Sequence, residues 1–136
     1  MTGVQTCALP ILYYIQYAHA RTCSVMRKLE EQGLKWSPEA GLSALEHLTE
    51  ESEMALLGQL DRFPEVLSAA AEKLEPHTIA TYLRELSADF HTWYNAHKML
   101  VEDQNVRDAR LALSQAVRQV IANGLALIGV SAPQSM

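Results

Sequence analysis

The longest apolar repeat in the sequence runs over residues 106–128 and keeps helical spacing throughout. Its members are Val106, Ala109, Leu113, Ala116 or Val117, Val120, Gly124, and Leu127 or Ile128. Apolar residues at steps of three and four lie on one face of an α-helix, so this segment predicts a long amphipathic helix. Asp103 or Asn105 is suited to cap its start, and Gly129 is suited to end it.

Residues 12–33 show the same spacing and predict a first helix that stops at Gly33. The apolar positions are Tyr14, Ile15, Ala18, Thr22, Val25, Met26 and Leu29. Residues 34–48 contain Trp36, Ser37, Pro38 and Gly41 without a clear period, which is typical of a linker.

Two further helices are expected between residues 49 and 96. Thr49 is a candidate N-cap, Pro64 is expected to kink the helix that follows, and Pro76 suits the first turn of the next one. The inward positions of that next helix are Ile79, Leu83, Leu86, Phe90, and Tyr94 or Trp93. About four helices with no strand signal predict an all-α helical bundle.

Length and charge limit the possible functions. The 136 residues suffice for one domain. The formal charge of -5 argues against a protein that grips nucleic acid of any sequence, so we expect no DNA partner and only local RNA contacts. No apolar run approaches the ~20 residues that cross a bilayer, so no membrane partner is expected. Cys7 and Cys23 show no zinc spacing, and we expect reduced thiols, as in cytoplasmic proteins.

No catalytic constellation is present in the sequence. We find no Gly-rich phosphate loop, no nucleophile elbow and no carboxylate–histidine pairs with the spacing of a di-iron bundle. The five histidines are scattered over different segments, so no metal site is predicted. We expect no catalytic residue and no cofactor in this chain.

Two groups of residues could bind RNA, but each also has a simpler structural explanation. Arg107 and Arg118 are three helical turns apart, with Arg110 about sixty degrees away, so they could form a basic stripe. The alternative is a solvated face paired with carboxylates such as Asp108. Trp93 and Tyr94 could stack on unpaired bases, although such aromatic residues more often belong to a core.

Residues Met1–Ile11 reproduce the translation of a common sequencing-library adapter that is read from its first base with GTG as the start codon. They lack the basic start and the continuous apolar core of a signal peptide. We therefore expect residues 1–11 to be adapter-derived and the native sequence to start at or just after Leu12.

Residues 12–136 resemble a known family. The segment Tyr14-Ile-Gln-Tyr17-Ala-His-Ala-Arg21 is similar to the junction between the catalytic and anticodon-binding domains of class I arginyl-tRNA synthetases of bacterial type. The region from Phe90 to Asn95, the final helix and Met136 also resemble that family. One departure is present: the domain is named for Asp-Ala-Leu-Arg, whereas Asp108-Ala109 is followed here by Arg110-Leu111.

The resemblance implies an anticodon-binding helical domain at residues 49–136, joined by the linker 34–48 to a helix at 12–33 that leads to a catalytic domain. By resemblance, Tyr17, Arg21, Tyr94 and Met136 would contact the tRNA. Tyr17 and Arg21 lie one helical turn apart and so share a face, and an arginine fork suits phosphates and base edges. Gln16, Arg107, Arg110 and Arg118 are possible further contacts, and His19 belongs to the site or supports it.

The implied partners are arginine tRNA and the catalytic domain of the same cytoplasmic enzyme. That enzyme would use ATP with magnesium to attach arginine to its tRNA, through His-Ile-Gly-His and Lys-Met-Ser-Lys-Ser-like motifs that this sequence lacks. The chain alone is thus expected to have no adenylation activity. The alternatives are a stand-alone helical protein–protein interaction module without RNA specificity and a small helical-bundle enzyme.

Overall fold

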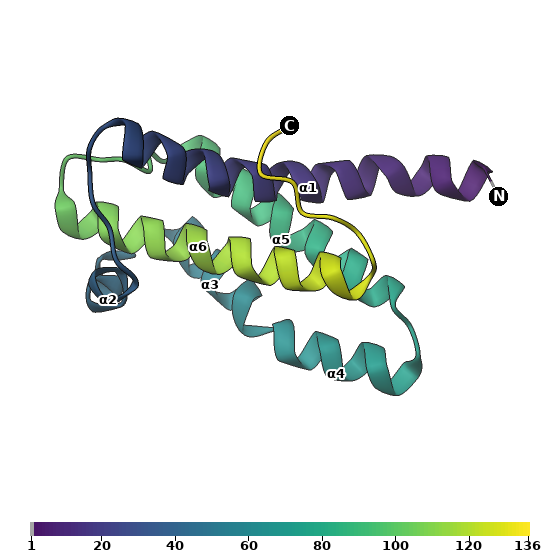
Figure 1. Ribbon diagram of the computed structural model, residues 1–136. Coiled ribbons are helices and arrows are strands. Elements are labelled where there is room, and N and C mark those ends of the chain that lie inside the picture. Colours follow the sequence, from purple (N-terminus) through teal and green to yellow (C-terminus); the bar gives the residue numbers. More distant parts are fainter. Residues whose placement is uncertain (1) are drawn as a thin grey trace.

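The computed structural model describes the backbone of residues 2–136 and the side chains of residues 10–136. Within these residues the chain forms helices and no strand (Figure 1). In order they are α1 (Thr2–Glu31), α2 (Pro38–Ser43), the 3-10 helix η1 (Leu45–His47), α3 (Glu51–Asp61), α4 (Phe63–Lys73), α5 (His77–Ala96) and α6 (Gln104–Leu127). The all-α prediction is confirmed. The prediction that residues 1–11 are adapter-derived concerns residues that mostly lie outside those whose side chains are described, and it stays a prediction.

Helix α5 lies at the centre of the bundle. It packs against α1, α3, α4 and α6, while α2 crosses α6 near the start of that helix (Figure 1). After α6 the chain turns back and runs across α1, so residues 130–136 lie beside the first helix rather than projecting from the bundle. We call residues 130–136 the C-terminal tail.

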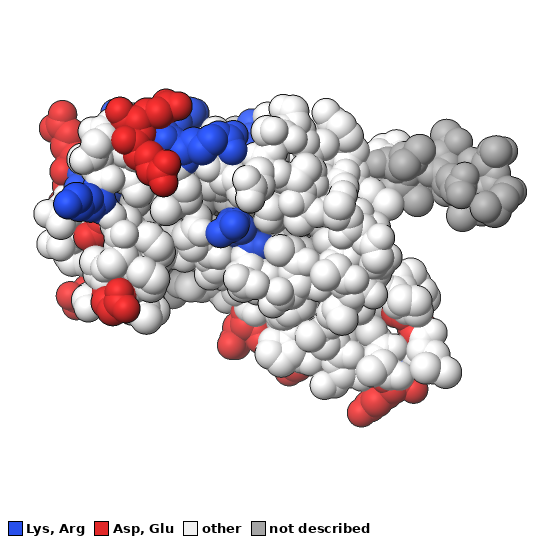
Figure 2. All heavy atoms as spheres, in the orientation of Figure 1, with Lys and Arg blue, Asp and Glu red and all other residues white. Residues whose placement is uncertain are grey.

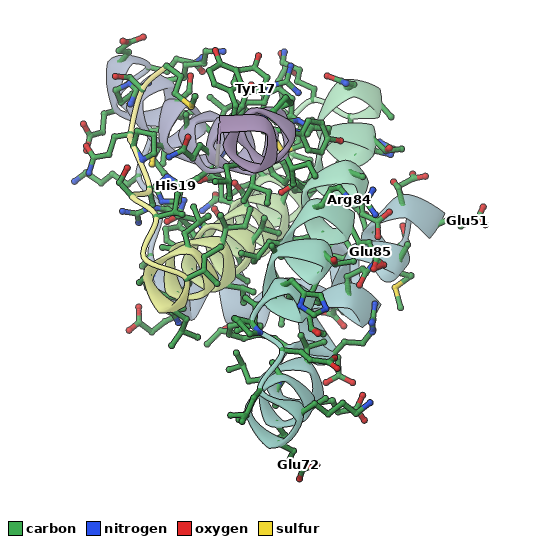
Figure 3. The ribbon with its side chains drawn as sticks, turned by 90° about the vertical axis from the view of Figure 1, so that its right-hand side faces the viewer. Tyr17, His19, Glu51, Glu72, Arg84 and Glu85 are labelled. Carbon is green, nitrogen blue, oxygen red and sulfur yellow. The ribbon has the colours of Figure 1, made fainter. Side chains whose placement is uncertain are left out.

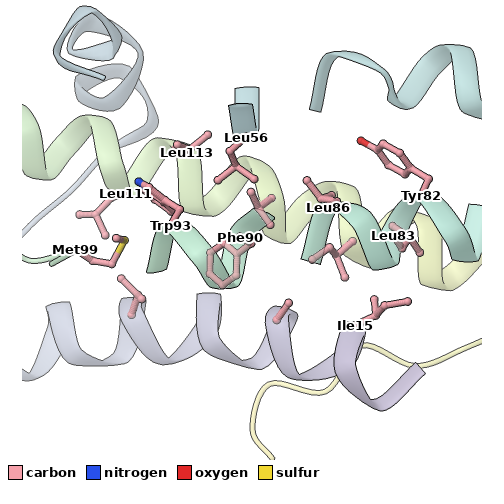
Figure 4. Packing of buried hydrophobic residues seen from close by; sticks show 14 of the residues in the cluster. Ile15, Leu56, Tyr82, Leu83, Leu86, Phe90, Trp93, Met99, Leu111 and Leu113 are labelled. Atoms are coloured by element: carbon pink, nitrogen blue, oxygen red, sulfur yellow. The ribbon is translucent and has the colours of Figure 1, made fainter. Parts of the chain in front are cut away.

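The core forms where the apolar faces of α1, α5 and α6 meet (Figure 4). Its fully buried side chains include Ile15 from α1, Leu86, Phe90 and Trp93 from α5, and Leu113 from α6. The inward face predicted for residues 79–94 is thus confirmed, and Trp93 rather than Tyr94 is the buried member of the pair. Tyr94 is only partly buried and can face a site at the surface.

Two of the predicted helix ends are confirmed, because Gly33 and Gly129 follow α1 and α6 with positive φ angles of 69° and 76°. Asp103 caps α6 by accepting hydrogen bonds from the backbone N–H groups of the first turn. The cap of α3 is Glu50 rather than Thr49, because Glu50 and Glu53 form a reciprocal capping box.

Two segments differ from expectation. The chain breaks at Arg62 into two helices, and Pro64 stands in the first turn of the second instead of kinking one long helix. The expected linker at 34–48 contains α2 and η1, because the Ser37 side chain caps a turn that begins with Pro38. Both differences arise from local capping.

Gly124 of α6 lies against the side chain of Leu83 from α5. A Cβ atom there would lie 2.7 Å from Cδ2 of the fully buried Leu83. We expect Gly124→Ala to lower the free energy of unfolding by about 1 kcal/mol in a urea titration, because overpacking outweighs the gain in helix propensity. Gly58, inside α3 with nothing within 4 Å, is the matched control. Gly58→Ala should raise stability by about 0.5–1 kcal/mol, and a gain for both variants would contradict the expected clash.

Candidate functional site

A cavity of about 280 Å³ opens where α1, α5 and the C-terminal tail meet. Tyr17, Arg21, Tyr94 and Met136 all line it, although they come from the first helix, the fifth helix and the last residue. The structure therefore brings together all four residues named first as tRNA contacts. We call it the α1–tail cavity.

Arg21 lies between two aromatic rings at this cavity. Its guanidinium carbon is 4.7 Å from the ring centroid of Tyr17 and 4.6 Å from that of Tyr94. Its Nη1 also donates hydrogen bonds to Nδ1 of His91 at 3.0 Å and to Oδ1 of Asn95 at 3.2 Å. Cation–π contacts and hydrogen bonds thus hold a charged group in one orientation before any ligand arrives.

His91 is the residue that the sequence reasoning missed. It is 8% exposed, and its ring stacks on Tyr17 with centroids 5.5 Å apart. Because Nδ1 accepts from Arg21, the ring is neutral with its proton on Nε2. Burial, reinforced by the charge of Arg21, lowers the pKa of His91 below 6.5. The signal available in the sequence was weak: His91 and Asn95 are one helical turn apart in the region that resembles the family.

The C-terminal tail is held against α1 by three side chains. Gln16 Nε2 donates to the carbonyl oxygen of Ser131, His19 Nδ1 to that of Pro133, and Arg27 Nη1 to that of Gln134, each at 2.9 Å. Figure 3 shows Tyr17 and His19 leaving α1 in different directions, with His19 toward the tail. These bonds bring Met136 to the cavity. Gln16 and His19 therefore support the site, and direct contact of Gln16 with tRNA stays a prediction.

The three arginines of α6 lie elsewhere. Arg110 donates from Nε to Oε2 of Glu53 at 3.0 Å, and only 12% of its side chain is exposed. Arg107 donates to the carbonyl oxygen of Val101, and Arg118 to the side chain of Gln115. None of the three lines the α1–tail cavity. Each is engaged with groups of the bundle itself, and their role as further tRNA contacts stays a prediction.

Positive charge is concentrated near the cavity despite the net charge of -5. Arg21, Arg27 and Lys28 all line it. Figure 2 shows Lys and Arg side chains over the C-terminal half of α1, with Asp and Glu side chains directly beside them. Cysteine, histidine and carboxylate side chains of residues 10–136 form no cluster that could hold a metal ion. Within the described chain, no helix has the length and apolar character to span a membrane.

Burial of two histidines makes stability depend on pH. Burial lowers the pKa of His19 as well, and the charge of Arg118 adds to this effect. Folding lowers the pKa of both imidazoles below the unfolded value of 6.5. Above pH 6.5 both rings are neutral in either state, and the folded chain has its full stability. As pH falls toward the folded pKa, the rings are protonated more readily in the unfolded chain, so the free energy of unfolding decreases.

We therefore expect the urea midpoint to fall between about pH 7.5 and about pH 5.5, and to fall less in His19→Gln and His91→Gln. His77→Gln, at an exposed position, is the matched control. An equal pH effect in all variants would contradict a contribution from the buried rings.

Comparison with known proteins places the chain in a family. The family model described as the DALR anticodon binding domain matches residues 15–136. The chain belongs to the DALR anticodon-binding domain family. Arginine–tRNA ligase of Thioalkalivibrio sulfidiphilus is 62% identical over 125 residues, and that of Halorhodospira halophila is 58% identical over 125 residues. Both alignments cover 92% of this chain and 21% of the relative, so the chain spans about a fifth of the length of these relatives.

Solved structures agree with this assignment. The arginyl-tRNA synthetase of Thermus thermophilus is 35% identical, with a TM-score of 0.74 over 90% of this chain and 21% of the other. A structure described as a putative arginyl-tRNA synthetase of Campylobacter jejuni is 28% identical, with a TM-score of 0.79 over 93% of this chain and 26% of the other. The DALR family match therefore holds for sequence and fold, and it includes every residue that lines the α1–tail cavity.

Proposed function

We propose that this DALR domain binds the anticodon arm of arginine tRNA as the C-terminal domain of an arginine–tRNA ligase. The observation that carries the proposal is the α1–tail cavity, in which Arg21 is fixed between Tyr17 and Tyr94. Proteins read single-stranded RNA mainly by stacking its unpaired bases on aromatic rings or arginine planes and by forming hydrogen bonds with the edges of those bases. The cavity supplies both kinds of group.

The chemistry of the cavity suits one base and its phosphate. Tyr17 is 38% exposed, so part of its side chain is accessible to a nucleotide beside its contacts with Arg21 and His91. The guanidinium of Arg21 uses Nη1 for its protein partners, which leaves other N–H groups of the fork for a base edge or a phosphate. Met136, 49% exposed, adds an apolar wall. We therefore assign base recognition to Arg21 and packing to Tyr17, Tyr94 and Met136.

The remainder of the enzyme carries the chemistry in this proposal. Because the chain spans about a fifth of its relatives' length, arginine activation with ATP and magnesium would belong to a catalytic domain joined through α1. The whole enzyme would act in the cytoplasm, where tRNA is charged. This chain would supply tRNA selection and no step of adenylation.

A salt titration tests the proposal. Binding of the chain to arginine tRNA and to a second tRNA is measured by fluorescence anisotropy at increasing salt. Attraction to phosphates is screened as salt rises, whereas base recognition leaves a preference for arginine tRNA. Equal affinities at every salt concentration would reject the proposal and favour an interaction module without RNA specificity.

A further inference from the structure

A second cavity of about 280 Å³ lies beside the α1–tail cavity. It is formed by the C-terminal half of α1 and by residues 97–100, which follow α5. Lys28 and Tyr94 line both cavities, so the two sites share a wall. None of the residues assigned to tRNA binding above lies in the second cavity except Tyr94.

The lining of the second cavity is apolar at its base and basic at its rim. Val25 and Met99 are 2% and 6% exposed and form the floor. Lys28, Gln32 and Lys98 are exposed at the edge. No carboxylate is among the residues that line it. Such a cavity suits a flat, partly apolar ligand that carries hydrogen-bonding edges and is attached to negative charge.

Contacts from outside the cavity fix the segment that forms its far wall. The backbone N–H of His97 donates to the carbonyl oxygen of Trp93 at 3.1 Å, and Ser52 Oγ lies 3.1 Å from Nε2 of His97. Arg110 Nη1 donates to the carbonyl oxygen of Lys98 at 2.8 Å. The Glu53–Arg110 ion pair therefore also holds the backbone of this wall. The site is formed without a ligand, which lowers the cost of binding.

We infer that the second cavity binds the base of the nucleotide adjacent to the one held in the α1–tail cavity, and that Lys28 meets the phosphate between them. Consecutive nucleotides share one phosphate, so two neighbouring base sites with a cation at their common wall suit them. Lys28 and Tyr94 provide that wall. Gln32 would hydrogen-bond the base edge, and Lys98 would face the outer phosphate. This inference rests on the proposed function.

The test combines a protein variant with altered RNA. Anticodon stem-loops of arginine tRNA are prepared in which each loop nucleotide in turn lacks its base, and the affinity of each is measured by anisotropy. The double variant Gln32→Ala/Lys98→Ala should bind the intact loop roughly tenfold more weakly, because one hydrogen bond and one charge contact are lost. Both side chains are exposed, so the fold should be unaffected.

The decisive readout is the coupling between variant and loop. The double variant should lose less affinity on one abasic loop than on all the others, because that loop already lacks the base bound in the second cavity. Arg21→Ala should likewise lose less affinity on one abasic loop. The two missing bases should be neighbours in the loop. Lys73→Ala/Gln119→Ala, which removes the same residue types from outside both cavities, is the matched control and should bind as the unchanged chain does.

Two results would overturn the inference while leaving the proposed function intact. Either the double variant binds every loop as well as the unchanged chain, or its weakening is equal on all abasic loops, as general attraction to phosphates would produce. Failure of the proposed function has a different signature. In that case the unchanged chain would show no preference for the arginine stem-loop over an unrelated one.

Discussion

Replacing Arg21 with alanine is expected to weaken binding of the arginine anticodon stem-loop about thirtyfold, equivalent to about 2 kcal/mol. Hydrogen bonds from a charged donor contribute more than neutral ones, and the variant removes every N–H group of the fork at once. It also leaves Nδ1 of His91 and Oδ1 of Asn95 without their shared donor. The measurement is an affinity at fixed salt, with circular dichroism to check the fold.

Two further variants separate recognition from general charge. Arg21→Lys keeps the positive charge but not the planar fork, so it should recover less than half of the lost binding energy. Arg84→Ala removes an exposed arginine of α5 that lines neither cavity (Figure 3), and it should change affinity little. If Arg84→Ala and Arg21→Ala weaken binding equally, Arg21 acts only through net charge and the recognition role assigned to it is wrong.

The largest expected loss of stability comes from Glu53, which is 1% exposed and accepts three hydrogen bonds. The donors are Nε of Arg110 at 3.0 Å, Nε1 of Trp93 at 3.0 Å and the backbone N–H of Glu50 at 3.1 Å. Glu53→Ala should lower the free energy of unfolding by about 3–5 kcal/mol, because it leaves the charge of a largely buried arginine without its carboxylate and a buried indole N–H without an acceptor. Urea unfolding followed by circular dichroism measures the loss.

Glu51, two residues earlier in α3 and exposed, is the matched control (Figure 3). Glu51→Ala should cost at most about 0.5 kcal/mol, since exposed charges contribute little. The double variant Glu53→Met/Arg110→Met should be less destabilised than Glu53→Ala, because it leaves no unpaired charge. Equal losses for Glu51→Ala and Glu53→Ala would show that the buried network does not stabilise the bundle.

The parts of the fold that sequence reasoning predicted depend on local periodicity. The inward face of 79–94 requires only helical spacing, and it appears in the core. Of the stripe predicted for 106–128, Ala109, Leu113 and Val117 are core residues, whereas the structure adds Leu111, Ile121 and Leu125, which the predicted stripe did not include. Helical spacing does not decide between Trp93 and Tyr94, because both positions fall near the face that contains Phe90. The structure places Trp93 against Glu53, forty positions earlier in the chain, and no local pattern contains that contact.

The same limit applies to the candidate site. Tyr17 and Arg21 are one turn apart and could be paired from spacing alone. The partner His91 lies seventy positions from Arg21, so its role depends on how α1 packs on α5. Helical spacing alone does not show whether Arg110 contacts tRNA, because an exposed basic stripe and a largely buried ion pair have the same spacing in the sequence. The tail has no period at all, and its path across α1 is set by three side chains that bond to its carbonyl oxygens.

The path of the tail has a practical consequence for anyone who produces this chain. Residues fused after Met136 would begin at the mouth of the α1–tail cavity, so an affinity tag placed there would compete with the RNA being assayed. Mild carboxypeptidase digestion that stops before Val130 would remove one wall of the cavity while leaving the helices intact, because Val130 closes the end of α6 and residues 131–136 belong to no helix. A tag should therefore precede the chain, and intact mass should be verified before any affinity is compared.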